Sequence, residues 1–125
     1  MLKNILLVGL GGFIGSIARY LLSKINIYID IFSIPIGTLS VNIIGSFIIG
    51  FLTGISMKTS FLTLELKLLL IVGICGGFTT FSAFTNENLL FFQNEQYLSL
   101  IFYTILSIIL GFGSVYLGYF FSNSL

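Results

Sequence analysis

Four long apolar segments, separated by short polar connections, dominate the pattern of the chain. They cover about residues 4–23, 34–56, 65–92 and 97–121, and each reaches the roughly 20 residues that a helix needs to cross about 30 Å of hydrocarbon. Because every backbone group in hydrocarbon must find a hydrogen-bond partner, we expect each segment to be helical. The pattern predicts an all-α membrane protein with four transmembrane helices in a single domain, residues 1–125.

The composition supports this prediction and excludes several functions. The chain is 57% hydrophobic and 7% charged, with a mean hydropathy of +1.14, whereas a soluble domain carries about 25% charged residues. The formal net charge of +1 provides no basic stripe, so we expect no nucleic-acid partner. Histidine is absent and there is one cysteine, so zinc chemistry is excluded as well.

The first segment resembles two structures that we do not expect it to form. It resembles a signal peptide, but Arg19 stands where a small-residue cleavage site is expected, so we interpret it as a retained span. Gly9, Gly12 and Gly15, with Asp30 further on, imitate a dinucleotide-binding fingerprint. That motif requires a following βαβ pattern, and the remaining apolar segments do not have one.

Two other features of the first segment fit a membrane helix. Gly11 and Gly15 are four residues apart and predict a small-residue face for close helix packing. Arg19, the only arginine, has two interpretations. It could anchor the helix at the lipid headgroups together with Tyr20 and Lys24, or it could attract anions to a pore mouth.

The second segment carries a stripe of small and polar residues. It follows Pro35, which suits a first helical turn, and contains an amide, Asn42, near mid-membrane. This amide predicts either an interhelical hydrogen bond or a donor to an anion. The stripe recurs every four residues: Thr38, Asn42, Ser46, Gly50 and Gly54.

The third segment holds a sequence that disfavours a continuous helix, residues 73–84. Gly76 and Gly77 add backbone freedom, and Thr79 and Thr80 are β-branched. A helix break in hydrocarbon leaves carbonyl and N–H groups without partners, at several kcal/mol each. We therefore predict that the third helix is broken near Gly76–Thr80 and that the break is a candidate ion site.

Directly after the predicted break, Phe81 and Phe84 share a helical face. Phenyl groups in a membrane helix commonly contact lipid or other helices. Their positive ring edges could also face an anion without trapping it as a full charge would. Glu87, further along, is interpreted as a solvated residue at the membrane boundary.

The charges favour a particular assembly. Four spans place Lys3, Lys58 and Lys67 on one side of the membrane and Arg19 and Lys24 on the other. This three-to-two distribution gives almost no orientation bias, so the chain could insert both ways round. Four helices of this size do not easily enclose a pore. Together these points predict an antiparallel, dual-topology homodimer.

Three stretches together resemble one family, the fluoride channels called Fluc or CrcB. They are residues 11–20, 37–46 and 73–84, which lie in three of the four spans, in order and at the expected separations. The third stretch is highly specific, and the resemblance covers essentially the whole chain. It implies a transport protein and not an enzyme, placed in the cell (inner) membrane as a multi-pass protein.

The resemblance also implies functions for individual residues. It implies a fluoride-specific channel for passive efflux and protection from fluoride toxicity, built as a dimer with two pores and a structural sodium ion at its centre. The backbone carbonyls of Gly76 and Thr79 would bind the sodium ion. Gly111 departs from the family pattern, since some relatives have a hydroxyl there. The implied fluoride pathway comprises Asn42, Phe81, Phe84, Thr38, Ser107 and Arg19.

Two alternatives remain open at this point. A small dual-topology drug exporter driven by protons also has four spans, but it depends on a buried carboxylate in the first span, and this first span has none. The chain could also be a structural subunit of a larger membrane complex. The expected partners are fluoride, sodium, lipid and a second copy of the chain.

Overall fold

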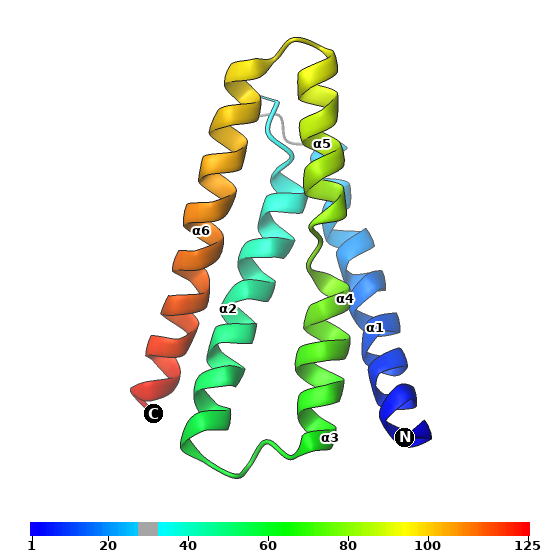
Figure 1. Ribbon diagram of the computed structural model, residues 1–125, viewed down its shortest axis with the longest axis vertical. Helices are drawn as coiled ribbons and strands as arrows, with labels where there is room; N and C mark the ends of the chain where they lie inside the picture. The colour runs from blue at the N-terminus through cyan, green and yellow to red at the C-terminus, as the bar shows by residue number, and fades with distance from the viewer. Residues whose placement is uncertain (28–32) are drawn as a thin grey trace.

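The computed structural model describes residues 1–27 and 33–125, and this part of the chain is all-helical. Asp30 of the imitated dinucleotide fingerprint lies outside the described residues. Helix α1 spans Leu2–Ser23 and continues into a short 3₁₀ turn, α2 spans Ile36–Lys58, and α6 spans Tyr97–Asn123. With the interrupted third span they form an elongated bundle (Figure 1).

Four spans are long and apolar enough to cross a membrane. They run over Leu2–Asn26, Ile36–Lys58, Leu64–Gln93 and Tyr97–Asn123. Both termini and the α2–α3 connection lie at one end of the bundle, and the α5–α6 connection lies at the other end (Figure 1). The predicted all-α membrane protein with four spans is therefore confirmed.

The third span consists of four consecutive helical pieces. The first piece is α3, Leu64–Lys67, which Thr63 caps by accepting a hydrogen bond at Oγ1 from Leu66 N (3.3 Å). The chain then continues as a π-helix over Leu68–Cys75, which the sequence pattern did not predict. Helix α4, Gly76–Phe78, and helix α5, Ser82–Gln93, follow.

The predicted break exists, but the glycine pair is not where the chain leaves the helix. Gly76 has helical dihedral angles (φ −63°, ψ −37°), and the extended residue is Thr79 (φ −81°, ψ 159°). Gly77 serves close packing instead, because a Cβ there would lie within 2.9 Å of Gly12 O. Glycine costs about 1 kcal/mol in a helix, and here it permits the close contact with α1. The break lies between Phe78 and Ser82.

Glycines hold the helices together at two backbone contacts. A Cβ at Gly11 or Gly15 of α1 would collide with the backbone of Leu69 or Ile74, so the predicted small-residue face does contact another helix. In the same way, a Cβ at Gly118 of α6 would collide with the backbone of α2. These contacts hold α1 against the third span and α6 against α2.

Most large apolar side chains point outward, and the buried core is small. Leu, Ile and Phe side chains along all four spans are exposed, as expected for a surface that faces lipid. The core lies toward the α5–α6 end of the bundle, where Ile34, Leu39, Phe91 and Tyr103 cluster. This core supports the face of α5 that carries the candidate site.

Candidate ion pathway

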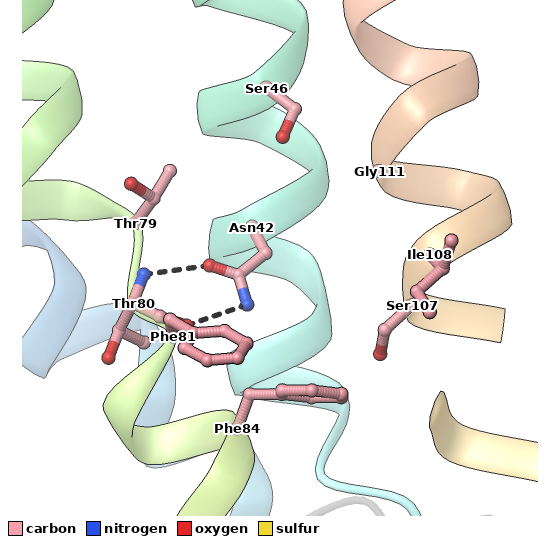
Figure 2. A pocket seen from close by; sticks show the side chains of 9 residues that line it. All are labelled: Asn42, Ser46, Thr79, Thr80, Phe81, Phe84, Ser107, Ile108 and Gly111. Atoms are coloured by element: carbon pink, nitrogen blue, oxygen red, sulfur yellow. Dashed lines mark hydrogen bonds between the residues drawn. The ribbon is translucent and has the colours of Figure 1, made fainter. Parts of the chain in front are cut away.

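A pocket of about 310 Å³ lies where α2, α6 and the break in the third span meet. We call it the central pocket, and none of the described residues that line it is charged. It brings together four residues that the sequence predicted for the fluoride pathway, and it adds Ser46, Thr79, Thr80, Ile108 and Gly111 (Figure 2). The four predicted residues are Asn42, Phe81, Phe84 and Ser107.

Asn42 holds the broken backbone in place. Its Nδ2 donates to Thr80 O (3.1 Å), and its Oδ1 accepts from Thr80 N (2.8 Å), as the dashed lines in Figure 2 show. The extended conformation at Thr79 leaves the backbone of Thr80 outside both helices, so the amide of Asn42 replaces the missing helical partners. The amide nitrogen carries two hydrogens, and one remains to donate into the pocket.

Thr80 also starts the next helix. Its Oγ1 accepts from Ala83 N (3.1 Å), which satisfies a free N–H of the first turn of α5. The same hydroxyl lies 3.2 Å from Ser82 Oγ. The break is therefore a defined structure, held by side-chain partners on both sides.

Phe81 and Phe84 lie as neighbouring rings below Asn42 (Figure 2). Their centroids are 5.7 Å apart, and their planes are tilted by 36°. Phe81 is 73% exposed, whereas Phe84 is partly buried and its centroid lies 5.2 Å from that of Tyr103. One ring is thus free on the subunit surface, and the other is supported by the core.

Ser107 contributes a hydroxyl from α6 to the same pocket. Its Oγ is buried and makes no hydrogen bond of standard geometry among the described residues, although the Tyr103 hydroxyl lies near it. A buried hydroxyl without a partner costs about 1–3 kcal/mol, so such a group indicates a position where a ligand or water binds. Ser114, two turns further on, instead donates to Leu110 O of its own helix (2.6 Å).

A second pocket, of about 200 Å³, holds the other two predicted pathway residues. We call it the arginine pocket: Arg19, Thr38, Thr80 and Glu87 line it, together with Ser23, Asn26, Val41 and Ala83. Thr80 lines both pockets, so they adjoin at the break. The predicted residues therefore form two neighbouring groups, one polar and uncharged and one containing charges.

Arg19 contacts the break from α1. Its Nε donates to Gly77 O (3.0 Å), a carbonyl that the interrupted helix leaves free, while its side chain also lines the arginine pocket. The arginine is partly buried and contacts the break, and this fits a role beside a pore better than a role as a headgroup anchor alone.

Glu87 is not the solvated boundary residue that the sequence suggested. Its Oε2 accepts from Thr38 Oγ1 (2.5 Å), and its Oε1 accepts from Tyr103 OH (2.8 Å). The sequence signal for this position was helical periodicity, because Phe84, Glu87 and Phe91 share one face of a helix. Phe91 belongs to the buried core, and Phe84 packs against it. Glu87 therefore lies on the inward face of α5.

Asn26 is another residue that the sequence did not single out. Its Oδ1 accepts from Gly37 N (2.5 Å), and its Nδ2 donates to Thr38 Oγ1 (3.4 Å). It joins the end of the first span to the first turn of α2. No simple pattern marked it, because the contact connects two different spans.

The backbone carbonyls at the break differ in whether a side chain donates a hydrogen bond to them. Gly77 O and Thr80 O each accept from a side chain, whereas no described side chain donates to Gly76 O or Thr79 O. In the described part of the chain, no three His, Cys, Asp or Glu residues come together as a metal site. Backbone oxygens are the ligand type that a hard cation accepts, so Gly76 and Thr79 fit such an ion chemically.

The fold and these two pockets define a multi-pass membrane protein with an uncharged polar pocket beside an interrupted helix. The family model described as "CrcB-like protein, Camphor Resistance (CrcB)" matches residues 6–119. The chain belongs to this family, which confirms the resemblance drawn from the sequence. The family comprises transport proteins rather than enzymes.

Relatives in diverse organisms are similar over almost their whole length. The chain is 44% identical to a protein of Azobacteroides pseudotrichonymphae over 119 residues, which is 95% of each chain. It is 46% identical to a protein of Gloeothece citriformis, with 92% of this chain and 93% of that protein covered. It is 47% identical to a protein of Methanococcus maripaludis, with 94% and 93% covered. Each of these relatives is named "Fluoride-specific ion channel FluC".

Proposed function

We propose that this protein is a fluoride-specific channel that lets fluoride leave the cell passively and so protects the cell from fluoride. The observation that carries the proposal is the central pocket. It combines two phenyl rings, the Asn42 amide and the unpartnered Ser107 hydroxyl, with no charged residue among its described lining. The names of the relatives support fluoride as the permeating ion.

The chemistry of the pocket suits a small, strongly hydrated anion. A pore must replace the water of such an ion with hydrogen-bond donors, and Asn42 and Ser107 each have one to give. The rings of Phe81 and Phe84 can present their positive edges to the anion. Because these are partial charges, the anion is held weakly enough to leave again.

The arginine pocket would supply the ion. Arg19 is a permanent cation beside the break, and a cation in a partly closed cavity raises the local concentration of anions. Thr80 lines both cavities, so an anion attracted to Arg19 would be next to the central pocket.

We also infer that two copies assemble as an antiparallel homodimer with dual topology. Phe81 lines the central pocket yet is 73% exposed in one subunit, so a single copy does not close this wall. The two termini and the α2–α3 connection share one end, which gives the near-even charge distribution that dual insertion needs. An axis in the membrane plane would bring the two breaks together.

A sodium ion at that axis would join the two subunits. Gly76 O and Thr79 O of each copy would supply four oxygen ligands, and neither carbonyl accepts from a described side chain. The ion would neutralise the carbonyl dipoles of two broken helices. Its chemistry is electrostatic and structural.

The experiment is fluoride efflux from proteoliposomes that contain the purified chain, recorded with a fluoride electrode. We expect rapid fluoride efflux and little chloride efflux under the same conditions. Equal permeation of chloride would contradict the proposed selectivity, and no flux from the chain alone would favour the structural-subunit alternative. Repeating the measurement with an imposed proton gradient separates a channel, whose flux is unaffected, from a proton-coupled exporter.

A further inference from the structure

The carboxylate of Glu87 is held between hydroxyls from two other helices. Tyr103 of α6 donates to Oε1 (2.8 Å), and Thr38 of α2 donates to Oε2 (2.5 Å). Both donors are buried: Tyr103 is 0% exposed and Thr38 is 3% exposed. Hydrogen bonds to an ionised group are among the stronger ones in proteins, so this arrangement fixes α5 relative to both neighbouring helices.

Tyr103 connects this carboxylate to the phenylalanine pair. The centroid of its ring lies 5.2 Å from that of Phe84, with a 52° tilt, and 5.9 Å from that of Phe91, at 80°. Phe84 in turn lies 5.7 Å from Phe81. Three consecutive contacts thus lead from Glu87 to the exposed ring of the central pocket.

The tyrosine hydroxyl determines where its ring can lie. Since the hydroxyl is at the end of the ring axis, its bond to Glu87 fixes the position of that end of the ring. Phe84 packs against this ring, and the energy of an aromatic pair depends on offset and angle. Loss of the hydroxyl bond would therefore broaden the orientations open to Phe84 and, through it, to Phe81.

Glu87 itself is unsuited to binding an anion. A carboxylate accepts hydrogen bonds and repels negative charge, and both of its oxygens already have donors. Neither Glu87 nor Tyr103 lines the central pocket. Any effect of Glu87 on that pocket passes through other residues.

We propose that Glu87 is a positioning residue for ion selectivity: through Tyr103 it sets the geometry of the Phe84–Phe81 pair. The inference rests on the proposed function, since it concerns discrimination between fluoride and chloride. A well-ordered ring pair matches one ion size, whereas a loosened pair admits a larger anion. The predicted effect is on the fluoride-to-chloride permeability ratio of the folded protein.

The experiment compares Tyr103→Phe with a matched control, Thr104→Val. Each removes one hydroxyl of α6 that bonds a residue of α5, because Thr104 Oγ1 accepts from Asn88 Nδ2 (3.1 Å). The Thr104 side chain bonds Asn88 and does not line the central pocket. Both variants are reconstituted, and the permeability ratio and melting temperature are measured.

We expect Tyr103→Phe to lower the ratio by about 10-fold, the effect of roughly 1.4 kcal/mol of lost discrimination. Thr104→Val should leave it within about twofold of the original. An unchanged ratio in Tyr103→Phe, or an equal fall in Thr104→Val, would overturn the proposal. If the wild-type protein itself carries no fluoride, the proposed function fails instead, so the two failures are distinguishable.

Glu87→Gln tests the same contact without altering Tyr103, so it keeps the test decisive should Tyr103→Phe fold poorly, and a double-mutant cycle is added where both single variants fold. Glu87→Gln retains the size of the side chain but weakens its acceptance from Tyr103. If the two residues act as one unit, the double variant Glu87→Gln with Tyr103→Phe discriminates no worse than either single variant. Additive losses, or an unchanged ratio in Glu87→Gln, would contradict the positioning role.

Discussion

Asn42 of α2 and Thr80 of the broken span are joined by two hydrogen bonds, from Thr80 N to Asn42 Oδ1 (2.8 Å) and from Asn42 Nδ2 to Thr80 O (3.1 Å). One side chain thereby satisfies both backbone groups of a residue that lies in no helix. The same amide lines the central pocket. Asn42 therefore supports the break and also lines the pocket in which we propose that the anion binds.

Asn42→Ala should destabilise the protein and abolish fluoride flux. The substitution leaves the N–H and C=O of Thr80 without partners, at about 1–3 kcal/mol each. Thermal melting in detergent and efflux from proteoliposomes measure the two effects. The control is Asn88→Ala, which loses one side-chain hydrogen bond to Thr104, away from both pockets. It should melt lower yet conduct, and equal loss of flux in both variants would contradict the prediction.

Phe81→Ile should reduce fluoride efflux by at least about 10-fold, equivalent to roughly 1.4 kcal/mol in the barrier, while the protein stays folded. The ring is 73% exposed, so little packing is lost within the subunit. Phe112→Ile is the matched control, because Phe112 is 77% exposed and lies outside the central pocket. Undiminished efflux in Phe81→Ile would remove this ring from the pathway.

Arg19→Gln should reduce efflux and lower the melting temperature. It removes the cation of the arginine pocket and leaves Gly77 O without its donor, at about 1–3 kcal/mol. Lys24→Gln is the control, because it removes one positive charge near the same end of the first span. Lys24 Nζ lies 4.8 Å from the centroid of the Tyr20 ring and not at the break. If both variants lose efflux equally, the effect is one of net charge and not of position.

If sodium joins two subunits as proposed, replacing it should weaken the dimer and lower its melting temperature. A ligand that binds only the folded state at 100 times its dissociation constant stabilises that state by about 2.7 kcal/mol. Melting and subunit dissociation are measured in sodium, potassium and N-methylglucamine chlorides at equal ionic strength. Identical behaviour in the three salts would count against the proposed cation site at Gly76 and Thr79.

Gly118→Ala should destabilise the protein by about 1–3 kcal/mol, the usual cost of overpacking. A Cβ at this position would collide with the backbone of α2 at Phe47. Gly113→Ala in the same helix has no atom within 4 Å of the new Cβ and should be neutral or slightly stabilising. Denaturation midpoints of the two variants measure this difference, and equal midpoints would show that close approach is not the cause.

Much of the fold and site could be predicted from the sequence. Long apolar runs can only be satisfied as helices in hydrocarbon, so four spans followed from length and composition. The resemblance to the fluoride channels implied Asn42, Phe81, Phe84 and Ser107 as pathway residues, and they line one pocket. Helical spacing and residue chemistry alone left packing and lipid contact open for these side chains.

The exact place of the break was decided by tertiary contacts. Local propensity pointed to the range Gly76–Thr80; within it Gly76 and Gly77 stay in the helix, where Gly77 allows the close approach of Gly12. The chain leaves the helix at Thr79, and Asn42 replaces the backbone partners that Thr80 lacks. Propensities of about 1 kcal/mol are smaller than these contacts.

The environment of Glu87 likewise depended on structure. A carboxylate near the end of an apolar span is usually solvated, and nothing in its neighbours along the chain identified Thr38 or Tyr103 as donors. Those hydroxyls come from two other helices, 49 and 16 residues away in sequence. By itself, the sequence determined how many helices cross the membrane and which faces are polar. Only the tertiary structure decided which polar groups meet, because that depends on how helices distant in the chain pack together.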